Sequence, residues 1–206
     1  MLYASDQQSG TWTDRVGNLR VTIPDSATFE SEYVRLTGTA LSVPLKTNPN
    51  ILSSVTYVVR FRVSTLPTNQ GWVMSQSPDY GWSRAITIND NRLGYVGQTP
   101  GSFDSSLGKI AVDSWNILIG TWTQNGNCQT WLNGVAGKAR TCSSGRGSNA
   151  NEALVIGGRH VIDKHHNPTA IDISHALVYN RAITQDDIVQ IQSALSGKAH
   201  FLLISD

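Results

Sequence analysis

Alternation of apolar and polar positions with a period of two residues dominates this chain. In the segment 55–63 every odd position is apolar, whereas the even positions include two arginines. Such a pattern predicts a half-buried β-strand in a two-layer structure, because successive side chains of a strand point to opposite faces. Further strands are expected at 71–76, 84–89, 92–97 and 110–115, separated by residues that are typical of turns.

The segment 115–135, WNILIGTWTQNGNCQTWLNGV, predicts a three-stranded antiparallel meander. Its first turn is expected at 124–127, and its second turn at the pair Asn133-Gly134. Asn-Gly pairs favour positive φ at both central residues of a turn, which makes them a strong hairpin signal. Three tryptophans lie in this segment, and we expect Trp115, Trp122 and Trp131 to be buried.

One segment near the C-terminus has the periodicity of a helix. Thr184 is placed as its N-cap, and Asp187 completes a capping box three residues later. Ile183 and Ile188 flank this cap as a hydrophobic staple, and Gly197 is the expected C-terminal stop. The sequence therefore predicts one short helix in an otherwise all-β chain.

Composition limits the classes of partner. The chain has 206 residues, of which 15% are charged, and its net charge is +1. Basic residues do not cluster, so nucleic acid is not expected as a partner, and no apolar run is long enough for membrane insertion. The length fits one domain over residues 1–206. The N-terminus lacks the basic and apolar regions of a signal peptide, so we expect a cytosolic chain or an excised domain.

Several motifs, in order, resemble a known family. They are a Trp-led element at 12–18, the ending Trp131-Leu132-Asn133-Gly134, a late strand at 153–158 and a closing strand with its helix at 171–184. Together they resemble laminin G-like domains of the concanavalin A-like lectin/glucanase superfamily. The resemblance implies an all-β fold, a two-sheet antiparallel β-sandwich of jelly-roll type with one short C-terminal helix.

The resemblance implies function less sharply than fold, because one fold carries many activities. We expect a non-catalytic carbohydrate-binding or adhesion module, extracellular or surface-exposed, within a larger surface or secreted protein. Its partner would be a glycan or a cell-surface glycoprotein. The alternatives are a polysaccharide lyase or glycoside hydrolase of the same superfamily, and a purely structural module of a surface or phage fibre protein. The oligomeric state stays open.

The two cysteines, Cys128 and Cys142, complete the thiol inventory. An unbroken ladder after the turn at Asn133-Gly134 would place Cys128 opposite Ala139, which leaves Cys142 three residues too far away. A bulge at Gly137, or the loop after Cys142 folding back, would close this gap. Because paired cysteines in a lectin-like domain indicate an oxidising compartment, we expect a disulfide, with a reduced pair as the alternative.

Candidate ligand-binding residues come from exposed aromatics and from a polar segment rich in histidine. Exposed rings stack on sugars, and imidazole, guanidinium and carboxylate groups bind sugar hydroxyls. The candidates are Tyr80, Trp82, Arg84, Tyr95, Arg159, His160, Asp163, His165 and His166. A lyase would instead use Arg84, Tyr95, His160 and Lys164. The spacing in 158–168 matches no known zinc site, so a polar hairpin tip is the preferred interpretation.

Calcium is a cofactor that the resemblance implies, since many members hold Ca²⁺ at one rim of the sandwich. The candidate ligands, chosen by their turn positions, are Asp79, Asp90, Asp104 and Asp163. None lies in a dense acidic loop, although calcium sites usually gather several oxygen ligands.

The supply of carboxylates argues against glycoside hydrolysis, which needs a pair of them. The chain has three Glu, namely Glu30, Glu32 and Glu152. Glu30 and Glu32 would share a face only in an extended strand, and their segment is better interpreted as a solvated loop. We therefore predict no catalytic residues.

Overall fold

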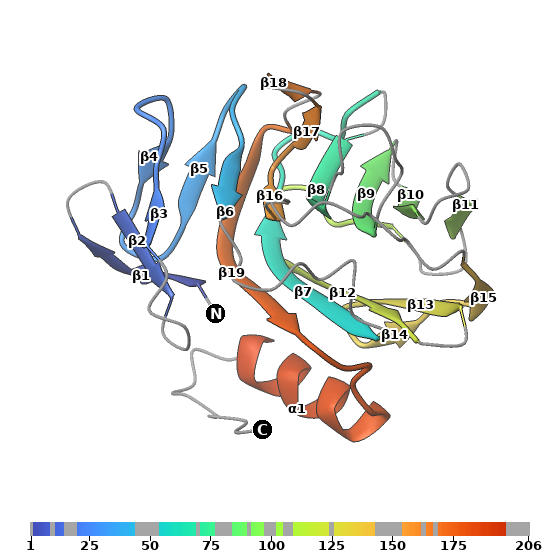
Figure 1. The fold of residues 1–206 in the computed structure, drawn as a ribbon. Helices are drawn as coiled ribbons and strands as arrows, with labels where there is room; N and C mark the ends of the chain where they lie inside the picture. The colour runs from blue at the N-terminus through green and yellow to red at the C-terminus, as the bar shows by residue number, and fades with distance from the viewer. Residues whose placement is uncertain are drawn as a thin grey trace.

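The computed structural model describes residues 2–8, 11–14, 20–43, 54–68, 71–76, 84–89, 92–96, 102–104, 109–123, 126–142, 154–161, 164–166 and 169–196. In that part of the chain the backbone forms nineteen β-strands and one α-helix. All the strand pairings found there are antiparallel. Figure 1 shows two curved layers of strands with the helix below them.

The larger sheet has eleven strands and forms one layer of the sandwich. Its main path runs through β14 (Val135–Ala136), β13 (Asn127–Leu132), β12 (Asn116–Trp122), β7 (Val55–Arg62), β19 (Ile171–Tyr179), β1 (Leu2–Gln8), β2 (Thr11–Asp14) and β3 (Arg20–Thr22). Three further strands attach to this path: β15 (Arg140–Thr141) on β13, β5 (Val34–Leu36) on β19, and β4 (Thr28–Phe29) on β5.

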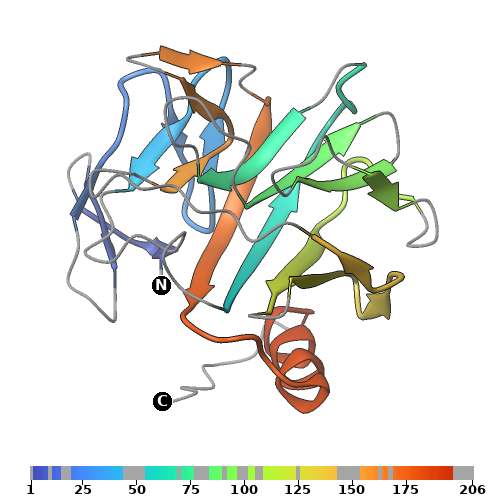
Figure 2. The same cartoon turned by 45° about the vertical axis from the view of Figure 1, so that its right-hand side comes forward.

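The smaller sheet has six strands and faces the larger one, as the turned view in Figure 2 shows. Its order is β11 (Ser102–Asp104), β10 (Arg92–Val96), β9 (Ala85–Asn89), β8 (Gly71–Gln76), β16 (Leu154–Ile156) and β6 (Leu41–Val43). A separate pair, β17 (Arg159–Val161) and β18 (Lys164–His166), lies beyond the end of β16. The expected two-sheet antiparallel sandwich is therefore confirmed.

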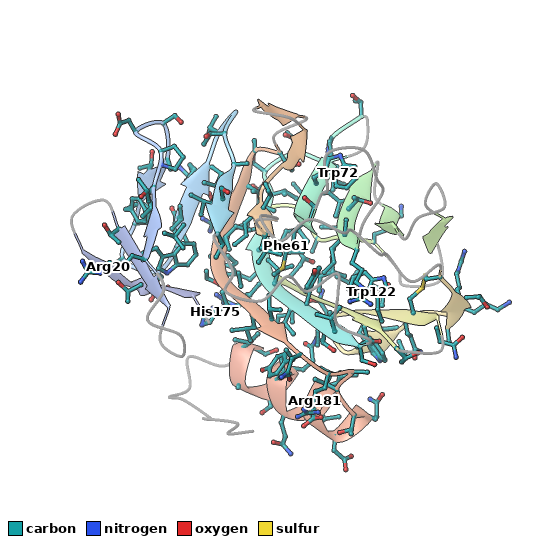
Figure 3. All side chains as sticks on the ribbon, viewed as in Figure 1. Arg20, Phe61, Trp72, Trp122, His175 and Arg181 are labelled. Carbon is teal, nitrogen blue, oxygen red and sulfur yellow. A yellow bond between two sulfur atoms is a disulfide. The ribbon has the colours of Figure 1, made fainter. Side chains whose placement is uncertain are left out.

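Strand β7 shows how the alternation builds the core. Its residues Tyr57, Val59 and Phe61 are fully buried among side chains of the smaller sheet, such as Met74 and Ile86. Phe61 and Trp122, both labelled in Figure 3, belong to this core, and the ring of Trp122 lies 5.2 Å from that of Tyr57. The even positions of β7 face the opposite side of the sheet. The burial predicted for Trp122 is confirmed.

The helix α1 (Gln185–Ser196) covers part of the outer face of the larger sheet. Its apolar side packs against Val58, Ile119 and Trp131 on that face, so the predicted burial of Trp131 is also confirmed. Thr184 Oγ1 accepts a hydrogen bond from the Asp187 N–H at 3.2 Å, and Asp187 Oδ2 accepts one from the Thr184 N–H at 2.7 Å. This is the predicted capping box. No helix of the described residues has the length and apolar character needed to cross a bilayer.

The predicted meander is confirmed, together with its second turn. β12, β13 and β14 pair in succession, and Asn133 and Gly134 have φ values of 48° and 85°. The predicted strand at 110–115 is wrong, because this segment turns through Asp113, whose φ is 56°, and β12 begins only at Asn116.

A disulfide joins Cys128 to Cys142, as expected, with 5.7 Å between their Cα atoms. Near the turn Trp131 lies opposite Ala136, but farther along Cys128 lies opposite Arg140 instead of the expected Ala139. One extra residue between these two pairings is a bulge, which brings Cys142 diagonally next to Cys128. The Cys142 N–H donates to the carbonyl of Gly126, which fixes this end of the ladder.

Candidate functional site

Three neighbouring strands place one carboxylate between two arginines on the outer face of the larger sheet. The register sets Asp172 of β19 opposite Arg35 of β5 on one side and opposite Arg62 of β7 on the other. Arg35 donates from Nε and Nη2 to Asp172 Oδ1 and Oδ2 at 2.8 and 3.2 Å. Arg62 donates from Nε and Nη2 to Oδ2 at 3.0 and 2.7 Å. We call these three residues the Arg-Asp-Arg row.

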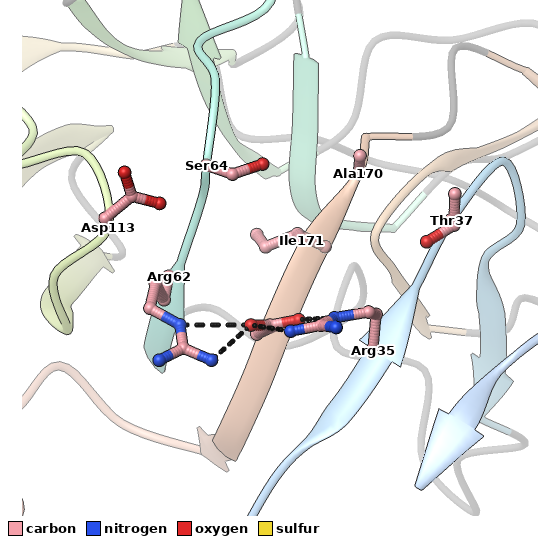
Figure 4. A pocket seen from close by; sticks show the side chains of 8 residues that line it. Arg35, Thr37, Arg62, Ser64, Asp113, Ala170 and Ile171 are labelled. Carbon is pink, nitrogen blue, oxygen red and sulfur yellow. Dashed lines mark hydrogen bonds and ion pairs between the residues drawn. The ribbon is translucent and has the colours of Figure 1, made fainter. Parts of the chain in front are cut away.

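A hollow of about 410 Å³ opens beside this row. A short, exposed side chain lies two positions away from each member of the row along the chain. These side chains are Thr37 after Arg35, Ser64 after Arg62 and Ala170 before Asp172. Because these three side chains are small, the surface is lower there than at the arginines. Figure 4 shows Ser64 and Thr37 on opposite flanks, Ala170 between them, and Asp113 on the side of Ser64.

The charges of the row are held in place by pairing. Burial alone would raise the pKa of Asp172, but hydrogen bonds from Arg35 and Arg62 outweigh it and hold this pKa below the ordinary value. The same hydrogen bonds raise the pKa of both arginines. The side chain of Asp172 is only 11% exposed, whereas those of Arg35 and Arg62 are 47% and 28% exposed. The arginines are therefore the accessible groups of the row.

Aromatic rings extend the row toward the helix. The guanidinium of Arg62 lies 5.0 Å from the ring centroids of both Tyr33 and Trp115, and that of Arg60 lies 4.4 Å from the ring of Trp115. The two rings meet edge to face at 5.9 Å. Burial lowers the pKa of Arg60, whose Nη1 donates to Ser174 Oγ at 2.9 Å. Stacked arginine and aromatic side chains thus cover the part of the face that α1 leaves open.

The predicted full burial of Trp115 is wrong, since its side chain is half-buried. The alternation places it on the same face as Ile117 and Ile119, and both of these are covered by α1. Trp115 lies just before β12, beyond the reach of the helix, and packs on arginines instead. The alternation correctly assigns Trp115 to the outer face of the sheet, but it does not predict whether another element packs over that side chain.

Four predicted ligand-binding residues are brought together in the strand pair β17–β18. Arg159 lies opposite His166, and His160 lies opposite His165. This pair stands near the start of β19, as Figure 1 shows, and Ala170, which lines the hollow, directly precedes β19. The pairing agrees with the expected hairpin in 158–168.

The other predicted residues are dispersed. Tyr95 lies in β10. Arg84 is only 1% exposed, so its guanidinium lies inside the protein and not on a surface that a glycan would reach. Tyr80, Trp82 and Asp163 lie outside the described residues.

The calcium expectation stays a prediction. Asp104 lies in β11, while Asp79, Asp90 and Asp163 fall outside the described residues. Within the part of the chain that the structure describes, no group of three or more His, Cys, Asp or Glu side chains is arranged to hold a metal ion.

The interpretation of residues 28–32 as a solvated loop is confirmed for Glu30 and Glu32 but wrong for Thr28–Phe29, which form the short strand β4 against β5. Glu30 and Glu32 are both exposed and lie in the connection between β4 and β5, where the Glu30 N–H donates to the carbonyl of Tyr33 at 2.9 Å. Glu152 lies outside the described residues.

The Arg-Asp-Arg row and the hollow were missed as a site from the sequence. Two features of the sequence involve residues of this site. They are the arginines on the polar side of the strand at 55–63 and Asp172, which lies between two isoleucines. Neither feature says that the three charges meet, because that depends on how β5, β7 and β19 pair.

Solved structures with a similar fold support the architecture. The Trypanosoma rangeli sialidase in complex with 2,3-difluorosialic acid matches with a TM-score of 0.75 at 13% identity, over 94% of this chain and 32% of that one. The same sialidase in complex with sialic acid gives a TM-score of 0.74 at 13% identity, over 95% of this chain and 32% of that one. The botulinum neurotoxin serotype D binding domain matches with a TM-score of 0.70 at 13% identity, over 94% of this chain and 50% of that one.

These likenesses show the fold alone. The chain spans about a third of the sialidase and half of the toxin domain. The comparison with curated proteins finds no match. A family model described as the concanavalin A-like lectin/glucanases superfamily, Laminin_G_3, matches residues 32–189, which is more than half of the chain. The chain therefore belongs to the laminin G-like domains of the concanavalin A-like lectin/glucanase superfamily.

Proposed function

We propose that this domain is a non-catalytic carbohydrate-recognition module of a larger surface or secreted protein. The observation that carries this proposal is the hollow beside the Arg-Asp-Arg row, on the outer face of a lectin-type sandwich. Its partner would be a glycan, free or on a cell-surface glycoprotein.

The chemistry of the hollow suits a ligand rich in hydroxyl groups. Guanidinium N–H groups of Arg35 and Arg62 donate hydrogen bonds, the carboxylate of Asp113 accepts them, and the hydroxyls of Thr37 and Ser64 do both. The hollow is partly open and offers little apolar area to bury. Binding of one site is therefore weak, and several linked copies would be needed for firm attachment.

The disulfide supports a location outside the cell or on its surface. Disulfides persist in oxidising compartments and are rare in the cytosol. The Cys128–Cys142 bond joins two buried side chains within the core. We therefore place the domain in an oxidising environment, as part of the same proposal.

The residues around β17–β18 are proposed as an extension of the binding surface. Arg159, His160, His165 and His166 come from this strand pair, and Asp163 falls between its strands. Tyr80, Trp82 and Tyr95 remain candidates for aromatic contacts. Calcium, if it is used, would be held by Asp79, Asp90, Asp104 or Asp163.

A glycan array with the purified domain tests the proposal. Ala170 is exposed, so Ala170→Leu should fill the hollow without disturbing the core, and Ala136→Leu on the exposed edge strand β14 is the matched control. We expect wild type and Ala136→Leu to bind the same glycans and Ala170→Leu to lose them. A parallel array in EDTA tests calcium. Absence of binding by the wild type would favour the structural-module alternative.

A further inference from the structure

We infer that the hollow selects an uncharged sugar ring, and that Asp172 is the positioning residue that sets this selectivity. The inference rests on the proposed function and names the class of glycan. It follows from which edges of the arginines are occupied, from the balance of charge around the hollow, and from the backbone conformation of Asp113.

The occupied edges of the arginines reduce their capacity to bind an acid through two N–H groups at once. A free guanidinium binds a carboxylate through two parallel N–H groups. In this site Nε and Nη2 of Arg35 already donate to Asp172, and so do Nε and Nη2 of Arg62. Asp172 thus occupies the side-on edge, Nε with Nη2, of both arginines, and Arg35 Nη2 also donates to Tyr33 Oη at 3.2 Å, so the end-on edge of Arg62 is the main bidentate edge left to a uronic or sialic acid. The remaining N–H groups suit single hydroxyl oxygens.

The charges around the hollow also cancel. Its lining contains two arginines, Arg35 and Arg62, and two aspartates, Asp113 and Asp172. Nearby, Glu30 acts electrostatically on Arg35, and Glu32 acts on Arg60. An anionic sugar would therefore gain little from the field of the site, although three arginines lie on this face.

Asp113 adds an acceptor that repels anions. Its φ of 56° lies in the left-handed region, which glycine adopts more readily than aspartate. Its N–H donates to the carbonyl of Val63 at 2.9 Å, which anchors the turn against the end of β7. Glycine would serve this turn with less strain, but only a side chain such as that of aspartate places a carboxylate at the hollow. A carboxylate there accepts hydrogen bonds from neighbouring sugar hydroxyls.

The hollow is small for a ligand site. Its 410 Å³ lies near the lower end of the range of ligand pockets, roughly 300–1,000 Å³. The short side chains of Thr37, Ser64 and Ala170 leave this space between the strands, and a longer glycan would extend from it along the surface.

The test is a titration of the domain, by calorimetry or NMR, with neutral oligosaccharides and with uronic, sialylated and sulfated ones. We expect the wild type and Ala136→Leu to prefer neutral sugars, and Ala170→Leu to lose them. Asp172→Asn removes the negative charge and one of the two acceptor oxygens, so it should partly free the side-on edges and shift the ratio of acidic to neutral affinity by on the order of tenfold toward the acids.

Asp113→Asn is the second variant, because asparagine tolerates positive φ and keeps an acceptor. It should shift the same ratio in the same direction by several-fold, even if Asp172→Asn folds poorly. A wild-type preference for acidic glycans, or unchanged ratios in both variants, would overturn the inference while leaving glycan recognition intact. If Ala170→Leu still bound glycans, the binding site would lie outside the hollow. Absence of binding to every class of glycan would contradict the proposed function itself.

Discussion

Asp172 is the residue on which the outer face of the larger sheet depends. It pairs with arginines on both neighbouring strands, and its own side chain is nearly buried. Loss of its charge would leave the cations of Arg35 and Arg62 on either side of a neutral side chain. We predict that Asp172→Asn lowers the free energy of unfolding by about 1–3 kcal/mol, measured by urea denaturation at neutral pH.

The pH dependence of stability follows from the same residue. Because the pKa of Asp172 lies below its ordinary value of 3.8 in the folded state, its ion pairs stabilise the fold above about pH 4. This contribution is lost as the pH falls through the folded-state pKa. The stability of Asp172→Asn should consequently decline less steeply in acid than that of the wild type. If the free energy of unfolding of the two proteins fell equally with decreasing pH, the pairing of Asp172 would contribute nothing to stability.

Trp115 and Asp172 show how far single residues could be predicted from the sequence. The alternation in 55–63 predicts which side chains face the core, and Asp172 is a charged residue between two isoleucines. The hollow could not be predicted, since it depends on three small residues that become neighbours only through pairing. The burial of Trp115 depends on where α1 packs on the sheet, and the local sequence pattern does not predict that position.

The capping box is the element-scale device that starts α1. Thr184 and Asp187 exchange hydrogen bonds, and Arg181 donates to Asp187 Oδ2 at 2.8 Å. We predict that Thr184→Ala lowers the free energy of unfolding by about 1 kcal/mol, seen as a lower urea midpoint. Ser193→Ala, at an exposed position of the same helix, is the control and should change it by less than about 0.5 kcal/mol. Equal midpoints for the two variants would mean that the cap is not needed.

The disulfide stabilises the edge of the meander, beyond the reach of α1. It closes a loop with a sequence separation of 14 across the bulge between β14 and β15. We predict that its removal costs about 3 kcal/mol of stability, whether by reduction or by replacing both Cys128 and Cys142 with Ala. Alkylation followed by intact-mass analysis should find no free thiol in the native protein. Stability unaffected by reduction would limit the disulfide to a local role.

At this edge of the sheet, the sequence predicts the turn but not the bulge. The turn at Asn133-Gly134 followed from its sequence, because few residues adopt positive φ at two successive positions. The bulge that completes the disulfide had no unique sequence signal, and a strict ladder would have kept Cys142 out of reach. Only the presence of two cysteines argued for it.

At the scale of the molecule, the two faces of the larger sheet have different roles. Its inner face packs against the smaller sheet and forms the main core, whereas its outer face is divided between α1 and the arginine–aromatic cluster. Along β7 the helix packs on Val58, and the charged residues begin at Arg60. The sandwich is thus stabilised from within, and α1 leaves one end of its outer face uncovered.

The same arrangement argues against glycoside hydrolysis. The reaction needs a carboxylic acid kept protonated by its surroundings and a second carboxylate held opposite it. Asp172 is held ionised by two arginines, so it cannot donate the proton, and Glu30 and Glu32 are exposed and do not line the hollow. We predict no release of reducing ends from β-glucans or galactans, and no unsaturated product from uronic-acid polymers. Release of reducing ends that Asp113→Asn, Glu30→Gln or Glu32→Gln abolishes would make the domain a hydrolase, and unsaturated product independent of these residues would make it a lyase.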